Sequence, residues 1–199
     1  MWASVAQAGE VVGGIQKTPA RTPRGHAYPY LRVANVIRGR LDLREIHEFE
    51  LRDGELDRWR LQAGDVLVVE GNGSITEIGR CAIWNGEIED CVHQNHIIRI
   101  RFSHPVGPTC FHHYLNSNVG QTGIARVASS TSGLYTLSVS KVQKIVFPLA
   151  PAAEQVRIVA RIKALFSEAD VIEQTVARAR RQAEHVDQAL LARAFRGEL

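Results

Sequence analysis

The most regular hydrophobic pattern of the chain lies in its C-terminal segment. Between Ala152 and Phe195 there is no proline or glycine, and residues that favour helices dominate. A repeat averaging 3.5 residues predicts one long helix that pairs with another helix in a left-handed coiled coil. The apolar residues that recur there, at alternating intervals of three and four positions, form what we call the apolar seam: Ile162, Leu165, Ala169, Ile172, Val176, Ala179, Ala183, Val186 and Leu190.

The residues at both ends of this segment also favour a helix. Pro151 suits a first helical position, Glu154 suits the positive end of the helix dipole, and Gly197 suits a helix end. The helix would be roughly 65 Å long at 1.5 Å per residue. It could fold back across its own domain or pair with a helix of another molecule. The length favours intermolecular pairing, because one small domain cannot cover the whole seam.

Ahead of Pro148 the pattern is mixed, with short β-branched or aromatic runs between turn residues and short helical patterns. We therefore predict a mixed α/β (α+β) domain over residues 1–150, followed by the long helix over 151–199. The expected strands cover 30–37, 66–70, 80–84, 97–102 and 145–147, the expected helices 53–59, 110–118 and 138–144, and the expected loops 71–74 and 129–133.

Composition is that of a soluble globular protein, with 45% hydrophobic and 23% charged residues among 199. No apolar run approaches the roughly 20 residues of a membrane helix, and the N-terminal residues lack the features of a signal peptide. Three cysteines are too few for a disulfide framework. We therefore expect a cytoplasmic protein that has no membrane partner.

The net charge of +3 is unevenly distributed. The segment from Asp42 to Asp57 contains seven acidic residues and two arginines. The rest of residues 1–150 contains 14 Lys/Arg residues and 7 acidic residues. Such a surplus is compatible with nucleic-acid binding, and equally with basic residues scattered over a mixed surface.

Enzyme signatures are largely absent. The sequence has neither a phosphate-binding loop nor a nucleophile elbow, and we expect no cofactor. Two Cys/His groups could supply zinc ligands and leave a metal-dependent nuclease open as an alternative. Their spacing does not match known zinc motifs, which favours buried cysteines and loop histidines instead. The groups are Cys91, His93 and His96, and Cys110, His112 and His113.

Polar residues gather in three predicted loops. Amide side chains can bond adenine with two hydrogen bonds, so such loops suit base reading. Turn formation is the alternative, because Asn, Ser and Gly favour turns in any protein. The residues concerned are Gln94 and Asn95, Asn72 and Ser74, and Thr131 and Ser132.

Several motifs along the chain resemble one known family. Tyr30-Leu31-Arg32-Val33-Ala34-Asn35-Val36 comes first, and Arg60-Leu61-Gln62-Ala63-Gly64-Asp65-Val66-Leu67 follows with Glu70-Gly71. Next come Gly79-Arg80, His93-Gln94-Asn95-His96 and Thr131-Ser132-Gly133. The last are Phe147-Pro148-Leu149-Ala150-Pro151-Ala152-Ala153-Glu154-Gln155 and the stretch from Leu190 to Leu199. In their order and spacing these motifs are similar to the specificity subunits of Type I restriction-modification systems.

This resemblance implies a non-catalytic subunit that binds double-stranded DNA and docks a methyltransferase subunit, with a restriction subunit left open as a further partner. The family's usual subunit has two target-recognition domains and two long antiparallel helices, and each domain reads half of a bipartite site. Here one domain and one helix match, so a homodimer joined through the seam would supply two identical domains. An interaction module that acts only through its coiled coil is a further alternative.

The residues expected to contact DNA follow from the resemblance together with the loop chemistry. Gln94, Asn95 and His96 are candidates for base edges, while Arg32 and Asn35 could instead support a strand. The remaining loop candidates are Asn72, Ser74, Arg80, Thr131 and Ser132, and the candidates for phosphate are Lys17, Arg21 and Arg24.

Overall fold

The computed structural model describes residues 1–104, 107–131 and 133–198. Its described part divides into two compact units, Met1–Gln155 and Val156–Leu199. The division falls in the first turns of the long helix, a few residues after the boundary expected from the sequence. No helix in the described residues has the length and apolar character needed to cross a membrane.

A four-stranded antiparallel sheet forms the centre of the first unit. Its strands lie in the order β2 (Gly9–Gly13), β11 (Ile97–Phe102), β7 (Val66–Val69) and β9 (Cys81–Ile83). Every β7 side chain is buried, with alternate residues packing into two different hydrophobic clusters. Both faces of the sheet are therefore covered. This explains why the sequence of β7 is a continuous apolar run.

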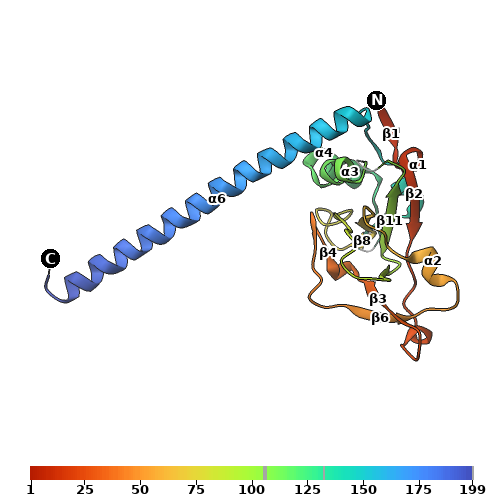
Figure 1. Ribbon diagram of the computed structural model, residues 1–199, viewed down its shortest axis with the longest axis horizontal. Coiled ribbons are helices and arrows are strands. Elements are labelled where there is room, and N and C mark those ends of the chain that lie inside the picture. Colours follow the sequence, from red (N-terminus) through yellow and green to blue (C-terminus); the bar gives the residue numbers. More distant parts are fainter. Residues whose placement is uncertain (105–106, 132, 199) are drawn as a thin grey trace. The chain divides into compact units, whose positions relative to one another are not determined.

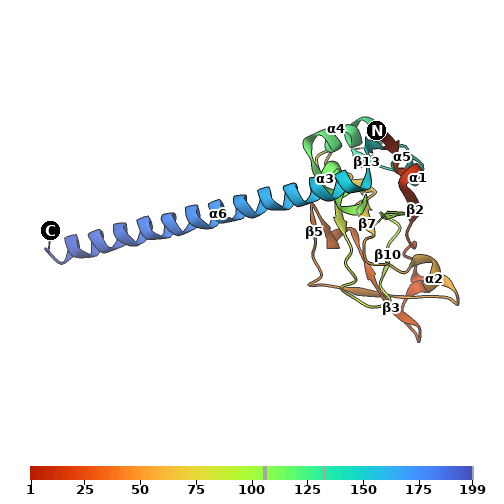
Figure 2. The ribbon, with the colours of Figure 1, turned by 45° about the horizontal axis from the view of Figure 1, so that its top comes forward.

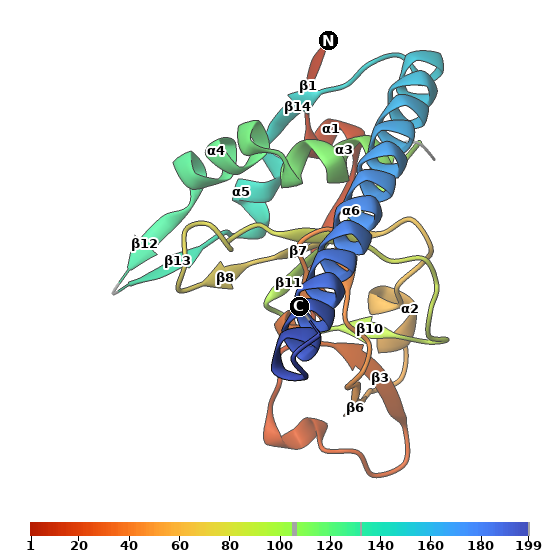
Figure 3. The same cartoon turned by 90° about the vertical axis from the view of Figure 1, so that its left-hand side faces the viewer.

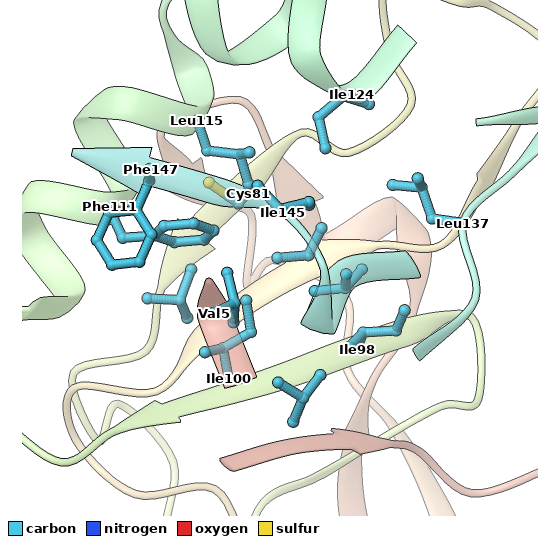
Figure 4. Packing of buried hydrophobic residues seen from close by; sticks show 14 of the residues in the cluster. Val5, Cys81, Ile98, Ile100, Phe111, Leu115, Ile124, Leu137, Ile145 and Phe147 are labelled. Atoms are coloured by element: carbon cyan, nitrogen blue, oxygen red, sulfur yellow. The ribbon is translucent and has the colours of Figure 1, made fainter. Parts of the chain in front are cut away.

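Short helices cover one face of this sheet, as Figure 3 shows above β7 and β11. Phe111 and Phe147 meet edge to face there, with ring centroids 5.0 Å apart. Figure 4 shows this cluster, in which Ile98 and Ile100 of β11 meet the helices. The helices are α1 (Val5–Ala8), α3 (Gly107–Asn116), α4 (Asn118–Val127) and α5 (Val139–Gln143).

The opposite face packs against a second cluster that includes Leu31, Trp84 and Cys91. A three-stranded sheet of order β10-β3-β6 carries a third cluster, in which the rings of Tyr30 and Phe49 stack with centroids 3.6 Å apart. Its elements are β10 (Val92–His93), β3 (Ala27–Leu31) and β6 (His47–Glu50), with α2 (Glu55–Trp59) alongside β10.

Smaller strand groups complete the unit. β1 (Trp2–Ser4) pairs with β14 (Val146–Pro148), and β4 (Val36–Ile37) pairs with β5 (Arg40–Leu41). The hairpin of β12 (Ser129–Thr131) and β13 (Leu134–Thr136) adds β8 (Gly71–Asn72) as a third strand. Short 3-10 helices span Pro19–Arg21 and Val33–Asn35.

An ionic network lies around the buried Asp65 carboxylate and two arginines of β11 in the central sheet. The Asp65 carboxylate, 1% exposed, accepts hydrogen bonds of 2.8 and 2.7 Å from the Arg101 guanidinium. Arg99, two residues earlier on β11, donates to Glu10 at 2.7 Å. Both arginines also donate to the carbonyl oxygen of Arg60. The network pairs the Asp65 carboxylate, which would otherwise be costly to bury.

The second unit consists mainly of one continuous helix. Figures 1 and 2 draw α6 (Ala152–Phe195) as an uninterrupted ribbon. Its predicted limits are confirmed, because no residue inside the segment breaks the helix, and Gly197 has the left-handed φ of +71° that favours glycine after a helix end.

Three expectations for the first unit are wrong in detail. The predicted strand 30–37 is interrupted at Val33–Asn35, where the Asn35 side chain accepts a hydrogen bond from the Arg32 backbone and stabilises a turn. The predicted loops 71–74 and 129–133 are in part strands, because β8 and β12 both pair with β13. Helix α4 was not predicted, because Gly120 disfavours helices; a Cβ there would lie 2.1 Å from the Tyr114 carbonyl oxygen, so close packing requires the glycine.

Candidate nucleic-acid interface

The three predicted polar loops meet at Glu70. Its backbone N–H donates to the His96 carbonyl oxygen at 2.9 Å, and its own carbonyl accepts from Leu137 N–H at 2.7 Å. Directly after Glu70, β8 pairs with Tyr135 and Thr136 of the hairpin, as Figure 3 shows at the side of the unit. We call this meeting point the Glu70 junction: the turn 94–96, the segment 70–76 and the strands β12 and β13.

The turn 94–96 is held rigidly by its backbone. Gln94 N–H donates to Leu31 at 3.0 Å, and Asn95 N–H donates to Ile15 at 2.8 Å. Neither amide side chain forms a hydrogen bond with other described residues, and both are only partly buried. This leaves two amide groups on a fixed backbone, an arrangement that suits bidentate contact with a base edge.

An ionisable pair flanks the amides. The Glu70 carboxylate lies 3.4 Å from Nδ1 of His96, with side-chain exposures of 28% and 55%. Burial raises the pKa of Glu70, and the nearby His96 ring partly opposes that rise. Glu70 is part of the Glu70-Gly71 motif that contributes to the family resemblance, but it was not among the residues expected to contact DNA.

Three other loop candidates, Ser74, Asn72 and Thr131, also lie at the junction. Ser74 Oγ lies 2.8 Å from Thr76 Oγ1, which tightens the segment after β8. The backbone of Asn72 pairs with Tyr135, and that of Thr131 pairs with Leu134. Ser132 lies outside the described residues.

Four candidates form contacts within the first unit. Asn35 is 3% exposed, and its side chain donates to the carbonyl oxygens of Asp42 and Glu45 at 2.8 and 2.9 Å. The Arg32 guanidinium lies 3.1 Å from the Glu45 carboxylate. These contacts hold the loop after β3, so strand and loop support is the better assignment for both residues.

Arg80 and Arg21 are likewise engaged within the unit. Arg80 donates to the carbonyl oxygens of Val36 at 2.7 Å and Val33 at 3.2 Å. Arg21 forms a bidentate pair with Glu55, with one hydrogen bond of 2.9 Å. Their side chains are 13% and 15% exposed, so neither guanidinium is open to a phosphate. Lys17 and Arg24, in contrast, are exposed.

The histidines and cysteines do not assemble into a metal centre among the described residues. His93 is fully buried and bonded through Nδ1 to the Ile97 carbonyl at 3.0 Å, and burial lowers its pKa to about 4. Burial also lowers the pKa of His112 to about 4 and raises the pKa values of the Cys81 and Cys91 thiols to about 12. These groups are therefore uncharged near neutral pH.

The apolar seam of α6 is exposed in the second unit. Ile162 is half-buried, and the exposed fractions of the other five large side chains range from 46% for Leu165 and Leu190 to 63% for Ile172. Five such apolar side chains on one stripe would be costly to leave in water. The seam therefore has the properties of an uncovered helix-pairing surface.

Comparison with known proteins shows what the chain is similar to. No family model matches the chain. It is 33% identical over 195 residues to the Type I restriction enzyme EcoKI specificity subunit of Escherichia coli K12, covering 96% of this chain and 41% of that protein. The StySPI specificity subunit of Salmonella potsdam is 30% identical over 178 residues, covering 88% and 38%. The chain is a homologue of Type I restriction specificity subunits. It spans about two fifths of the length of these relatives.

Solved structures agree with this homology at the level of the fold. The HsdS subunit from Thermoanaerobacter tengcongensis gives a TM-score of 0.64 at 18% identity, covering all of this chain and 45% of that one. A chain from work on assembly and conformational transition of the type I R-M system gives 0.70 at 19% identity, with 100% and 46% covered. Both confirm the mixed α/β domain with a long C-terminal helix.

Proposed function

We propose that this specificity-subunit homologue binds double-stranded DNA and reads one half of a bipartite site through the Glu70 junction. The observation that carries the proposal is the meeting of the three polar loops at Glu70, in a chain homologous to specificity subunits over 96% of its length. Gln94 and Asn95 read base edges, with His96 beside them. Lys17 and Arg24 contact phosphates, which fix the position of the domain on the duplex.

In this function the chain contributes recognition and no catalytic group. A methyltransferase subunit docks on it and supplies the chemistry, and a restriction subunit can join that complex. We place the protein in the cytoplasm, where these partners and DNA meet.

The test is binding by the chain together with its methyltransferase subunit to a pool of random duplexes, read by sequencing. Replacing Gln94 or Asn95 with Ala should change the preference at one position, because a base contact carries sequence information. Replacing Lys17 and Arg24 with Gln should weaken binding to all sequences alike and lower its salt dependence. Enrichment of no sequence by the wild-type complex would refute the proposal.

We also propose that two copies pair antiparallel through the apolar seam and so present two identical domains to a palindromic site. The exposed seam supports this pairing. The double substitution of Ile172 and Val176 by Asp should give monomers in light scattering that lose bipartite binding. Val171→Asp is a matched control, because Val171 is 60% exposed and lies outside the seam. An unchanged mass for the double variant would exclude the pairing.

A further inference from the structure

The seam contains both small and large side chains, and their positions limit how two copies can fit. Its alanines are Ala169, Ala179 and Ala183, and the positions between and beyond them are branched or larger. In an antiparallel pair each layer joins two different seam positions, so an alanine can face a large residue. A layer of two alanines would leave a gap in the interface, which is unfavourable.

We infer that two copies of α6 pair antiparallel in one stagger, with the two-fold axis between Ala177 and Arg178. This inference rests on the proposed homodimer and specifies its register. Val176 of one copy then lies opposite Ala179 of the second copy. By the same symmetry the next layers join Ile172 to Ala183, Ala169 to Val186 and Leu165 to Leu190, and Ile162 at the end of the seam lies opposite Arg193. Every alanine of the seam therefore faces a larger residue.

The neighbouring registers fit less well. A shift by one heptad toward the N-terminus places Ala169 opposite Ala179, and a shift by one heptad toward the C-terminus places Ala179 opposite Ala183. A two-heptad shift toward the N-terminus requires Gln155 to face Val186, but Gln155 is 4% exposed within the first unit. A parallel pair in register would oppose each alanine to itself, leaving three such layers.

Charges beside the seam favour the same register. Glu173 and Arg180 are exposed and flank the seam on one side of the helix. In the inferred stagger, Glu173 of each copy lies beside Arg180 of the other, which gives two opposite-charge pairs. A parallel pair would instead bring Glu168 beside Glu173, because these positions are five residues apart across the seam. At the two outer ends of the antiparallel pair, Arg161 of one copy approaches Arg196 of the other. The Arg196 guanidinium already donates a hydrogen bond to Glu198 at 2.7 Å.

Cross-linking between two distant positions tests the register directly. Leu165→Cys and Leu190→Cys are made separately in a Cys110→Ser background, since Cys81 and Cys91 are buried, and the two proteins are mixed with a short bis-maleimide. The mixture should give a covalent dimer, while each variant alone should not, because like positions are about 37 Å apart along the axis at 1.5 Å per residue. Dimer formation by Leu165→Cys alone, or by Leu165→Cys mixed with Ala183→Cys in place of Leu190→Cys, would overturn the stagger.

Charge reversal provides a second, independent measurement. Glu173→Arg and Arg180→Glu should each weaken dimerisation roughly tenfold, and the double variant should regain wild-type affinity. In a parallel dimer Glu173→Arg would strengthen pairing, which overturns the inference. Light scattering of the wild-type protein distinguishes failure of the homodimer from failure of the register. A monomer refutes the homodimer itself, whereas a dimer with the wrong cross-links refutes only the register.

Discussion

The backbone N–H of Glu70 donates to the carbonyl oxygen of His96 at 2.9 Å, and the side chains of the same two residues approach to 3.4 Å. The pair is thus joined twice, once through the backbone and once through ionisable groups. The backbone bond fixes the distance at which the ring and the carboxylate meet.

This relationship predicts how the carboxylate should titrate when the ring is removed. In His96→Ala the pKa of Glu70 should rise further, because burial then raises it without the opposing effect of the ring. A carboxyl-detected NMR titration of Glu70 measures the change directly. Glu48→Gln, at an exposed position of β6, serves as the control and should leave the titration of Glu70 unaltered. A Glu70 pKa that fell in His96→Ala would contradict the assignment.

The Asp65–Arg101 pair should contribute strongly to stability. Asp65→Asn should lower the free energy of unfolding by about 3 kcal/mol, because it leaves the Arg101 charge without its carboxylate. Urea unfolding followed by circular dichroism measures this change. Asp53 is exposed, so the control variant Asp53→Asn should unfold at the same urea concentration as the wild type. Equal unfolding midpoints for the wild type, Asp65→Asn and Asp53→Asn would show that the Asp65–Arg101 pair does not contribute to stability.

His93, which is buried, and His112, which is half-buried, predict a loss of stability in mild acid. The pKa values of His93 and His112 are about 4 in the fold, against 6.5 in an unfolded chain. Below pH 6.5 the unfolded state binds protons that the folded state does not, so stability falls as the pH falls toward 4. Each ring contributes up to about 3 kcal/mol to this loss.

The dependence can be measured by unfolding at a series of pH values between 6.5 and 4.5. His112→Asn should roughly halve its slope, since one of the two titrating rings is gone. Glu70 acts in the opposite direction, because its raised pKa lets the folded state take up a proton first. Carboxylates with lowered pKa values, such as Glu50 and Glu55, add to the loss of stability mainly near and below pH 4.5, the lower limit of this range. Stability that is constant from pH 6.5 to 4.5 would contradict the prediction.

Gly14 should not tolerate a side chain. A Cβ at this position would lie 2.3 Å from the Gln94 carbonyl oxygen and 2.4 Å from that of His93. Gly14→Ala must therefore push the turn 94–96 away from β2 and should lower stability by about 2 kcal/mol. Gly73→Ala has open space around it, so its thermal midpoint should stay near that of the wild type. A stable Gly14→Ala protein with an unchanged NMR spectrum for the turn would refute this view.

The sequence predicted some features well because their causes are local. The limits of α6 follow from its uninterrupted helical residues, and β7 and β11 follow from β-branched runs. The roles of Arg21 and Arg80 were not predictable in this way. Their partners are 34 and 44 residues away in sequence, and an arginine that is paired internally looks the same in a sequence as one that is free for a phosphate.

The candidate site shows the same limit. Gln94 and Asn95 could be selected by residue type, but their meeting with the hairpin depends on hydrogen bonds from Glu70 to two distant segments. The hairpin itself gave only a serine-rich signal typical of loops. Spatial assembly of the three loops is therefore a property of tertiary structure and not of any one motif.

The pairing of β1 with β14 has a consequence for how the first unit can be connected to other protein segments. Trp2 lies opposite Pro148, and Leu149 N–H donates to the Met1 carbonyl oxygen at 2.9 Å. The chain thus enters the unit beside the point where it leaves toward α6. A unit with adjacent ends can be linked in tandem or circularly permuted with a short connection, since no element of its core must move to accommodate the join.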